Sequence, residues 1–256
     1  MFIDVHCHLT GEEYDAVGGI DEVLTRAIGA GVDRMICSGF DLQSSLRAKE
    51  LAERYDFVYF CAGFHPSELD KYQGGDLEEI RKLCRHEKCV ALGEIGLDYY
   101  WEDNAPRAVQ LDWCRKQIEL ALELNLPIIF HDREAHEDTL TLLREYNPRG
   151  VLHCYSGSVE MMREVTALGL YIGLGGATTF KNARKPVEVA AAVPADRLLL
   201  ETDAPYMAPV PMRGKRCDSS MIAHTAARIA EIRCVDVDTL LEQTRRNANI
   251  LFGLDF

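Results

Sequence analysis

Short apolar runs alternate with longer amphipathic segments along the whole chain. The runs are rich in valine, isoleucine, leucine, phenylalanine and tyrosine, whereas the segments between them repeat with the period of a helix. Eight strands are predicted over residues 2–9, 34–40, 57–64, 89–96, 127–132, 150–155, 170–176 and 198–205. Repeated strand and helix units are typical of an α/β fold with a parallel sheet.

The length and composition favour one large core. The chain has 256 residues, of which 47% are hydrophobic, and no linker or low-complexity segment interrupts it. An open, doubly wound sheet would also alternate strands and helices, but it would normally carry a nucleotide fingerprint after an early strand, and none is present. We therefore predict a single (β/α)8 TIM barrel as the only domain, covering residues 1–256.

Two helices and one loop add detail to this barrel. A helix is predicted over residues 106–124, where Pro106 suits the first turn and one apolar stripe is formed by Leu111, Cys114, Ile118, Ala121 and Leu122. An extra C-terminal helix, from about Asp238 to Phe252, is expected to pack across the outside of the barrel. Residues 205–220 contain three prolines and Gly214 and are predicted to form a loop over the top.

Charge and cysteine content narrow the class of protein. A net charge of −13 argues against coating nucleic acid with a broad basic face, although a small catalytic contact stays open. The nine cysteines lack a CxxC pair and are expected to be reduced core residues of a cytoplasmic protein. No secretory signal follows Met1, and no apolar run is long enough to span a membrane.

Candidate metal ligands recur at the carboxyl ends of the predicted strands. His6 and His8 are two apart on one strand, so their side chains can converge on one ion, although an isolated HxH could equally cap a strand. The same strand ends carry Glu94, His131, His153 and Asp203. Because active sites of barrels lie at this face, and because buried charged groups need a partner, we predict a metal centre there.

Six ligands are more than one tetrahedral ion needs, so two divalent cations are expected. Glu94 is assigned as the bridge, with His6, His8 and Asp203 on one ion and His131 and His153 on the other. Ions about 3.5 to 4 Å apart can activate water and stabilise both oxygens of an in-line displacement, which suits phosphodiester hydrolysis. Asp203 is a candidate general base, although a carboxylate at this place could also cap a loop.

These residues resemble the TatD family of metal-dependent hydrolases and deoxyribonucleases, within the amidohydrolase-like barrels. The similar motifs run from end to end: DVHCHL, GFHP, GEIGLDYY, FHDREA, HCYSG, TTFKNA, LLLETDAPYMAP, RGKR and NANILFG. The resemblance implies the same six metal ligands, with Glu94 at the place where many wider relatives have a modified lysine. It departs after RGKR, where relatives usually continue with asparagine and a nearby proline, whereas this chain has Cys217-Asp218-Ser219-Ser220.

Further residues are candidates for substrate contacts. His65 of GFHP resembles a family histidine that lines the site without being a main ligand, although it could be a turn histidine before Pro66. Arg133 can hold a phosphate oxygen, or it can form a surface ion pair. Arg213 and Lys215 form a local basic patch for a polyanion, or an ordinary solvated run of charge.

Two more features lie close to the predicted ligands. Glu201 precedes Asp203 by two residues and is a candidate for orienting a metal ligand from behind. Tyr99 and Tyr100 could stack on a base, although such residues more often pack in the core.

The expected activity is that of a deoxyribonuclease acting on DNA ends with two bound cations, among magnesium, manganese and zinc. An alternative on the same site is an ester or aminoacyl-ester hydrolase similar to a D-aminoacyl-tRNA deacylase, and a binding protein without catalysis is a third. DNA is the expected partner. No obligate protein partner is implied, and we expect a monomer or a weak oligomer.

Overall fold

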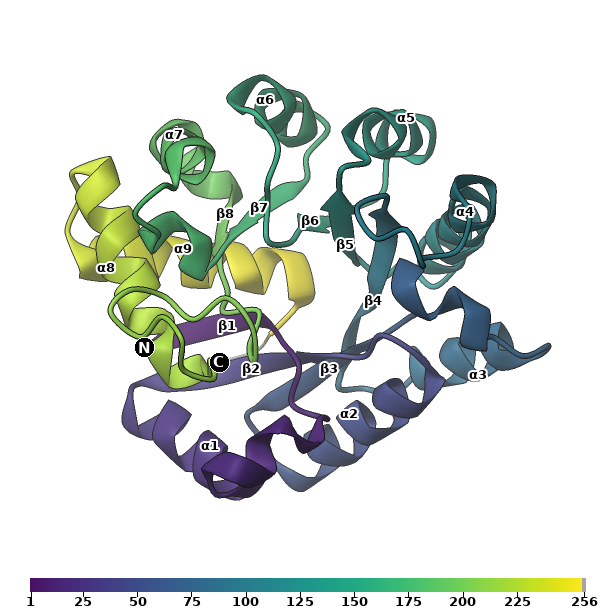
Figure 1. Ribbon diagram of the computed structural model, residues 1–256, viewed down its shortest axis with the longest axis horizontal. Helices are drawn as coiled ribbons and strands as arrows, with labels where there is room; N and C mark the ends of the chain where they lie inside the picture. The colour runs from purple at the N-terminus through teal and green to yellow at the C-terminus, as the bar shows by residue number, and fades with distance from the viewer. Residues whose placement is uncertain (255–256) are drawn as a thin grey trace.

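Eight parallel strands form one sheet in which spatial order follows sequence order. This computed structural model describes residues 1–254. The strands are β1 Phe2–Cys7, β2 Val32–Ser38, β3 Val58–Ala62, β4 Cys89–Asp98, β5 Ile128–Arg133, β6 Gly150–Leu152, β7 Tyr171–Leu174 and β8 Leu198–Leu200. The ring closes just beyond β8, where Ala204 bridges Cys7 of β1. The predicted (β/α)8 barrel is confirmed (Figure 1).

Every helix except the last surrounds the ring of strands, as Figure 1 shows. The helices are α1 Gly19–Gly29, α2 Leu42–Arg54, α3 Asp76–Leu83, α4 Arg107–Glu123, α5 His136–Tyr146, α6 Val159–Ala167, α7 Arg184–Ala192, α8 Ile222–Arg233 and α9 Val237–Phe252. Short 3-10 turns are η1 Glu12–Val17, η2 Pro66–Lys71, η3 Gly176–Thr179, η4 Ala195–Arg197 and η5 Ser219–Met221. The helix predicted over residues 106–124 is α4, which begins immediately after Pro106.

Strands β6 and β8 are shorter than predicted. The sequence indicated strands to residues 155 and 205, but the ladders end at Leu152 and Leu200. Beyond these ends Cys154 and Asp203 have φ values of 43° and 57°, a left-handed conformation that an extended strand does not tolerate. Consequently His153 and Asp203 lie on short irregular segments just past the barrel rim rather than within strands.

A bulge in β1 turns its histidines into the barrel. Asp4 pairs with Met35, and Cys7 pairs with Cys37. Between these two pairs, β1 therefore contains one residue more than β2. Val5 belongs to the inner apolar cluster, whereas Cys7 belongs to the cluster between strands and helices. Because an extra residue reverses the alternation, Val5 and His6 both face the interior. The bulge allows β1 to contribute Val5 to the apolar interior of the barrel and His6 and His8 to its carboxyl end.

Helix α9 closes the amino-terminal end of the barrel. Its buried residues Ala248, Leu251 and Phe252 pack against the inner side chains of the strands. Asn247 Nδ2 donates to the Leu198 carbonyl oxygen at 2.8 Å, at the start of β8. The predicted helix is therefore confirmed, but its predicted place along the outside was wrong, because its apolar face plugs the open bottom of the ring.

The cysteines largely meet the expectation of core residues. All nine are free thiols, and seven of them are buried, while Cys154 is half-buried and Cys234 is exposed. None of the helices within residues 1–254 combines the length and hydropathy needed to cross a membrane.

Candidate metal centre

The structure brings all six predicted ligands together at the carboxyl end of the barrel. They come from five separate segments: His6 and His8 from β1 and its end, Glu94 from β4, His131 from β5, His153 after β6 and Asp203 after β8. The backbone N–H of Asp203 donates to the His6 carbonyl oxygen at 3.0 Å, which fixes the first and last of these segments side by side.

The first ligand group consists of His6, His8, Asp203 and one oxygen of Glu94. His6 Nε2 and His8 Nε2 are 3.2 Å apart, and they lie 3.5 and 3.4 Å from Glu94 Oε2. Both nitrogens are 3.6 Å from Asp203 Oδ1. Tetrahedral ligands about 2.1 Å from an ion are about 3.4 Å from one another. The four atoms therefore have the spacing of a cation site.

The second ligand group uses the other oxygen of Glu94. Glu94 Oε1 lies 2.8 Å from His153 Nε2 and 3.0 Å from His131 Nδ1, and these two nitrogens are 3.2 Å apart. His65 Nε2 approaches the same oxygen at 3.4 Å. Since each oxygen of Glu94 faces a different set of nitrogens, this carboxylate stands between two groups that can each hold a cation.

Hydrogen bonds behind the rings determine which nitrogens are free to bind metal. His8 Nδ1 faces the Ser38 carbonyl oxygen at 3.1 Å, so this nitrogen must carry the proton. The lone pair of the neutral ring is then on Nε2. His131 Nε2 faces Asp98 Oδ2 at 3.2 Å, which leaves Nδ1 free in the same way. In the neutral form of both rings, the nitrogen without a proton is the one that faces the centre.

His65 has the opposite arrangement. Its Nδ1 accepts a hydrogen bond from the Ser67 backbone N–H at 3.2 Å, so the neutral ring carries its proton on Nε2, toward the centre. Burial lowers the pKa of His65 to about 3, which keeps the ring neutral. In this form Nε2 is a donor and not a ligand, and this supports the predicted substrate contact.

Electrostatics in the centre are dominated by burial and by Glu94. Burial raises the pKa of Glu94, but the surrounding histidines, His153 foremost, outweigh it and hold that pKa well below its usual value. Burial likewise lowers the pKa of His6 well below its usual value. For His131, hydrogen bonds to Asp98 and Glu94 outweigh burial and raise the pKa to about 9. Glu94 is thus ionised, and His131 holds a proton that a cation must displace.

Glu201 lies directly behind the second ligand group. It is fully buried, its Oε1 accepts from the Cys154 backbone N–H, and the same oxygen is 4.0 Å from His153 Nδ1. Gly173 makes room for it, because a Cβ there would lie 2.4 Å from Glu201 Oε2. Burial raises the pKa of Glu201 well above its usual value. The position fits the predicted role in orienting His153, which stays a prediction.

Two supporting residues were missed by the sequence analysis. Asp98 contacts His131, and Ser38 contacts both His8 and, through its hydroxyl at 3.0 Å, His6 Nδ1. Asp98 stands in the motif GEIGLDYY, where a carboxylate at a strand end could have drawn attention. Ser38 gives no such signal, because a serine at a strand end is common.

The unusual segment after Arg216 is a structural anchor. Ser219 Oγ donates to Asp4 Oδ2 at 2.6 Å, and Thr202 donates to the same carboxylate through both its backbone N–H and its hydroxyl. Arg26 pairs with Asp218 at 3.0 Å. Asp218 and Ser219 therefore hold the segment after Arg216 against α1 and β1.

The predicted basic contacts lie around the mouth of the barrel. Arg133 ends β5 and its guanidinium lies over the Tyr100 ring, 3.9 Å from the centroid. Arg213 is exposed and lies over the Phe180 ring at 4.0 Å, and Lys215 is exposed nearby in the sequence. Tyr99, by contrast, packs inward and donates to Asp138 at 2.7 Å. Substrate binding by these cations stays a prediction.

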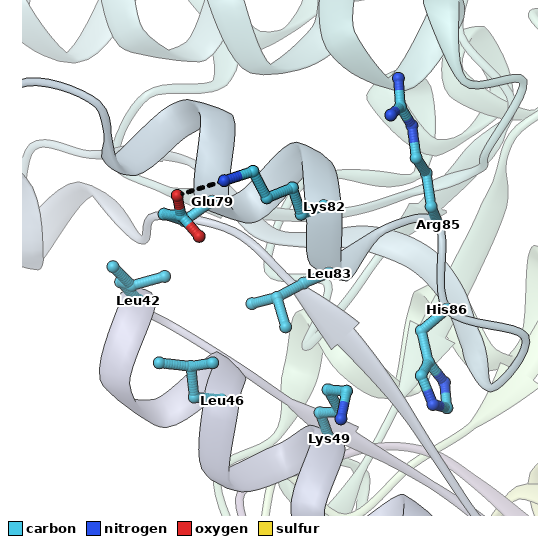
Figure 2. A pocket seen from close by; sticks show the side chains of 8 residues that line it. All are labelled: Leu42, Leu46, Lys49, Glu79, Lys82, Leu83, Arg85 and His86. Atoms are coloured by element: carbon cyan, nitrogen blue, oxygen red, sulfur yellow. Dashed lines mark hydrogen bonds and ion pairs between the residues drawn. The ribbon is translucent and has the colours of Figure 1, made fainter.

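A separate hollow of about 350 Å³ lies on the outer surface between α2 and α3. Figure 2 shows its apolar side, made by Leu42, Leu46 and Leu83, and the pairing of Lys82 with Glu79 at its edge. None of the predicted site residues lines it. This hollow is therefore separate from the candidate metal centre at the barrel mouth.

Comparison with protein families agrees with this centre. The model of the family described as TatD related DNase matches residues 3–253, nearly the whole chain. The chain belongs to the TatD family of metal-dependent hydrolases. The resemblance noted in the sequence is confirmed, and the His/Glu/Asp cluster is able to bind metal, as a metal-dependent hydrolase requires.

Individual TatD relatives match over their full length. The uncharacterized metal-dependent hydrolase YabD of Bacillus subtilis is 43% identical, with 100% of both chains covered. The 3'-5' ssDNA/RNA exonuclease TatD of Escherichia fergusonii is 34% identical, with 99% of each chain covered. The crystal structure of YJJV, a TatD homologue from Escherichia coli, superposes with a TM-score of 0.93 at 32% identity and covers 99% of this chain and 98% of that one.

Proposed function

We propose that this TatD hydrolase is a deoxyribonuclease that removes nucleotides from the ends of DNA strands by hydrolysing phosphodiester bonds with two divalent cations. The observation that carries the proposal is the placement of Glu94, whose two oxygens each face a separate group of ligand atoms. The E. fergusonii relative that bears an exonuclease name adds support.

The ligand set fits two cations of borderline hardness. Nitrogen and carboxylate donors suit zinc and manganese, and they suit magnesium less well. When bound, two such ions lower the pKa of water and offset the charge that develops on the attacking and leaving oxygens of a phosphodiester. The spacing within each group and the lone pairs of His8 and His131 meet the requirements of such ions.

The chain's own residues supply the remaining steps. Asp203 is the most solvent-exposed carboxylate of the centre, with 15% of its side chain accessible, so it is placed to accept a proton from the attacking water. His65 presents an N–H on Nε2 toward the centre and can donate it to a phosphoryl oxygen. Arg133, Arg213 and Lys215 provide cations at the mouth for the neighbouring phosphates.

The proposal is tested with protein stripped of metal and then reloaded with manganese, magnesium or zinc. We expect digestion of a single-stranded oligonucleotide from one end, and about two cations per chain by elemental analysis after reloading. The same preparations are offered D-aminoacyl-tRNA and an aryl ester. Turnover of either of these without digestion of DNA would replace the nuclease with the ester hydrolase.

A further inference from the structure

An exposed aromatic pair lies beside the metal centre. Tyr100 and Trp101 follow one residue after the end of β4, and they are 51% and 53% exposed. Their rings meet edge to face, with centroids 4.8 Å apart. Two neighbouring aromatic side chains at the mouth of the barrel therefore leave about half of their surface open to a ligand.

Arg133 completes this surface from the neighbouring strand. It follows His131 by two residues on β5, so its side chain leaves the strand on the same side as that ligand. Its guanidinium lies 3.9 Å from the Tyr100 centroid and 5.3 Å from the Trp101 centroid. It forms no hydrogen bond or ion pair with any residue from 1 to 254 through its side chain, so its N–H donors remain available.

Asp98 joins this surface rigidly to the metal centre. Its Oδ1 accepts from the Tyr100 backbone N–H at 2.9 Å, while its Oδ2 faces His131 Nε2 at 3.2 Å. The Tyr99 backbone N–H donates to the Arg133 carbonyl oxygen at 2.9 Å, which ties the two strand ends together. The backbone that carries Tyr100 is therefore tied to the second ligand group.

We propose that Tyr100, Trp101 and Arg133 form a stacking shelf for an unpaired nucleobase next to the phosphodiester that is cleaved. This inference rests on the proposed nuclease function and names the side chains that would hold the base beside the scissile bond. An unpaired base can place its face on the indole or on the guanidinium plane, and Arg133 can donate to the adjoining phosphate. Bases inside a duplex have no free face, so the shelf discriminates against paired ends.

Binding to the shelf is measured by tryptophan fluorescence. The chain contains two tryptophans, Trp101 and Trp113, and Trp113 is only 9% exposed. The emission of Trp101 is obtained by subtracting that of Trp101→Phe from that of the original chain. We expect an oligo-dT octamer to quench the Trp101 emission and an abasic octamer of equal charge to leave it unchanged. Equal quenching by both octamers would overturn the shelf.

Kinetics separate the shelf from the proposed function. Trp101→Ala is expected to raise KM for oligo-dT about tenfold, and Trp101→Phe to restore it, because phenylalanine keeps a stacking face. Tyr146→Ala, at the last residue of α5, is the matched control. If Trp101→Ala digests oligo-dT with the KM of the original chain, the stacking shelf is overturned, whereas the proposed nuclease function is supported. Quenching by oligo-dT without digestion of any nucleic acid would support the shelf and overturn the nuclease.

Discussion

At the residue scale, the chemistry depends on where single lone pairs and protons lie. Glu94 shares one carboxylate between two sets of nitrogens, and backbone or carboxylate acceptors fix the tautomers of His8 and His131. His65 is held in the other tautomer by a backbone donor. Residues of one type therefore have different roles, and the hydrogen bond behind each ring decides which role it has.

Removing charge from the bridge or from the candidate base should abolish activity without unfolding the barrel. We expect Glu94→Gln and Asp203→Asn each to lower kcat at least about a hundredfold, because a ligand charge or a proton acceptor is lost. Circular dichroism should show folded protein in each case. Glu87→Gln, at an exposed position with the same change of charge, is the control and should leave kcat unaltered.

Metal affinity should rise with pH. Because the pKa of His131 is raised to about 9 in the metal-free protein, a cation must displace a proton below that pH. The apparent affinity for manganese is therefore expected to increase about tenfold per pH unit between pH 7 and 9. Asp98→Asn removes a hydrogen bond that raises the pKa of His131. The increase of metal affinity with pH should therefore occur at lower pH in this variant. Calorimetric titrations at several pH values give both curves, and coincident curves would contradict the role of Asp98.

His131 also affects the stability of the metal-free protein. A raised histidine pKa means that the folded state holds the proton more tightly than the unfolded state. The stabilisation from His131 is therefore complete below pH 6.5, the ordinary value for histidine, and is lost as the pH rises through about 9. Metal removal and high pH should act together to lower the melting temperature.

At the scale of elements, bulges and short strand ends position the ligands. The bulge in β1 turns His6 inward directly after Val5, and an extra residue in β4 opposite Ile129 turns Glu94 inward. Left-handed residues Cys154 and Asp203 then bend the chain away from the ladder at the rim. The helices need only support the strands, because the ligands lie on strand ends and the turns that follow them.

Helix α9 is expected to stabilise the barrel without taking part in catalysis. Leu251 is buried against the inner apolar cluster, whereas Ile250 on the same helix is 62% exposed. Leu251→Ala should therefore lower the free energy of unfolding by about 2 to 5 kcal/mol, and Ile250→Ala by less than about 0.5 kcal/mol. Chemical denaturation measures both values. Equal losses would show that the lower end of the barrel is not closed by this helix.

At the scale of the whole molecule, the proposed nuclease function requires an acidic protein to bind a polyanion through a few local cations. The net charge is −13, yet Arg133 ends β5, and Arg213 and Lys215 lie on the loop after β8. Because the net charge repels a polyanion at long range, the proposal requires the contacts near the metal centre to select the substrate.

The salt dependence of substrate binding should reveal how many of these cations touch phosphates. Arg213→Gln and Lys215→Gln are each expected to reduce the slope of log KM against log salt concentration by about 0.7, the value for one phosphate contact on a single strand. Lys116→Gln on α4 is the control. Steady-state assays between low and moderate salt give the slopes, and unchanged slopes would mean that the basic loop is an ordinary solvated surface.

The sequence by itself determined the barrel and the set of candidate ligands. The strand and helix periods are local properties, and charged residues at the ends of apolar strands are costly without a common partner, so one segment after another offered a candidate: His6, His8, Glu94, His131, His153 and Asp203. The TatD motifs reinforced this because they occur in the same order.

Only the tertiary structure decided how these residues act. The β1 bulge, the early ends of β6 and β8, the place of α9 inside the lower rim and the tautomers of the histidines all depend on contacts between distant segments. The contacts of Asp98 and Ser38 with the histidines could be recognised only in the structure for the same reason. Periodicity reports which way a side chain points relative to its neighbours in the chain, whereas the proton on a ring nitrogen depends on an acceptor that the fold brings from elsewhere.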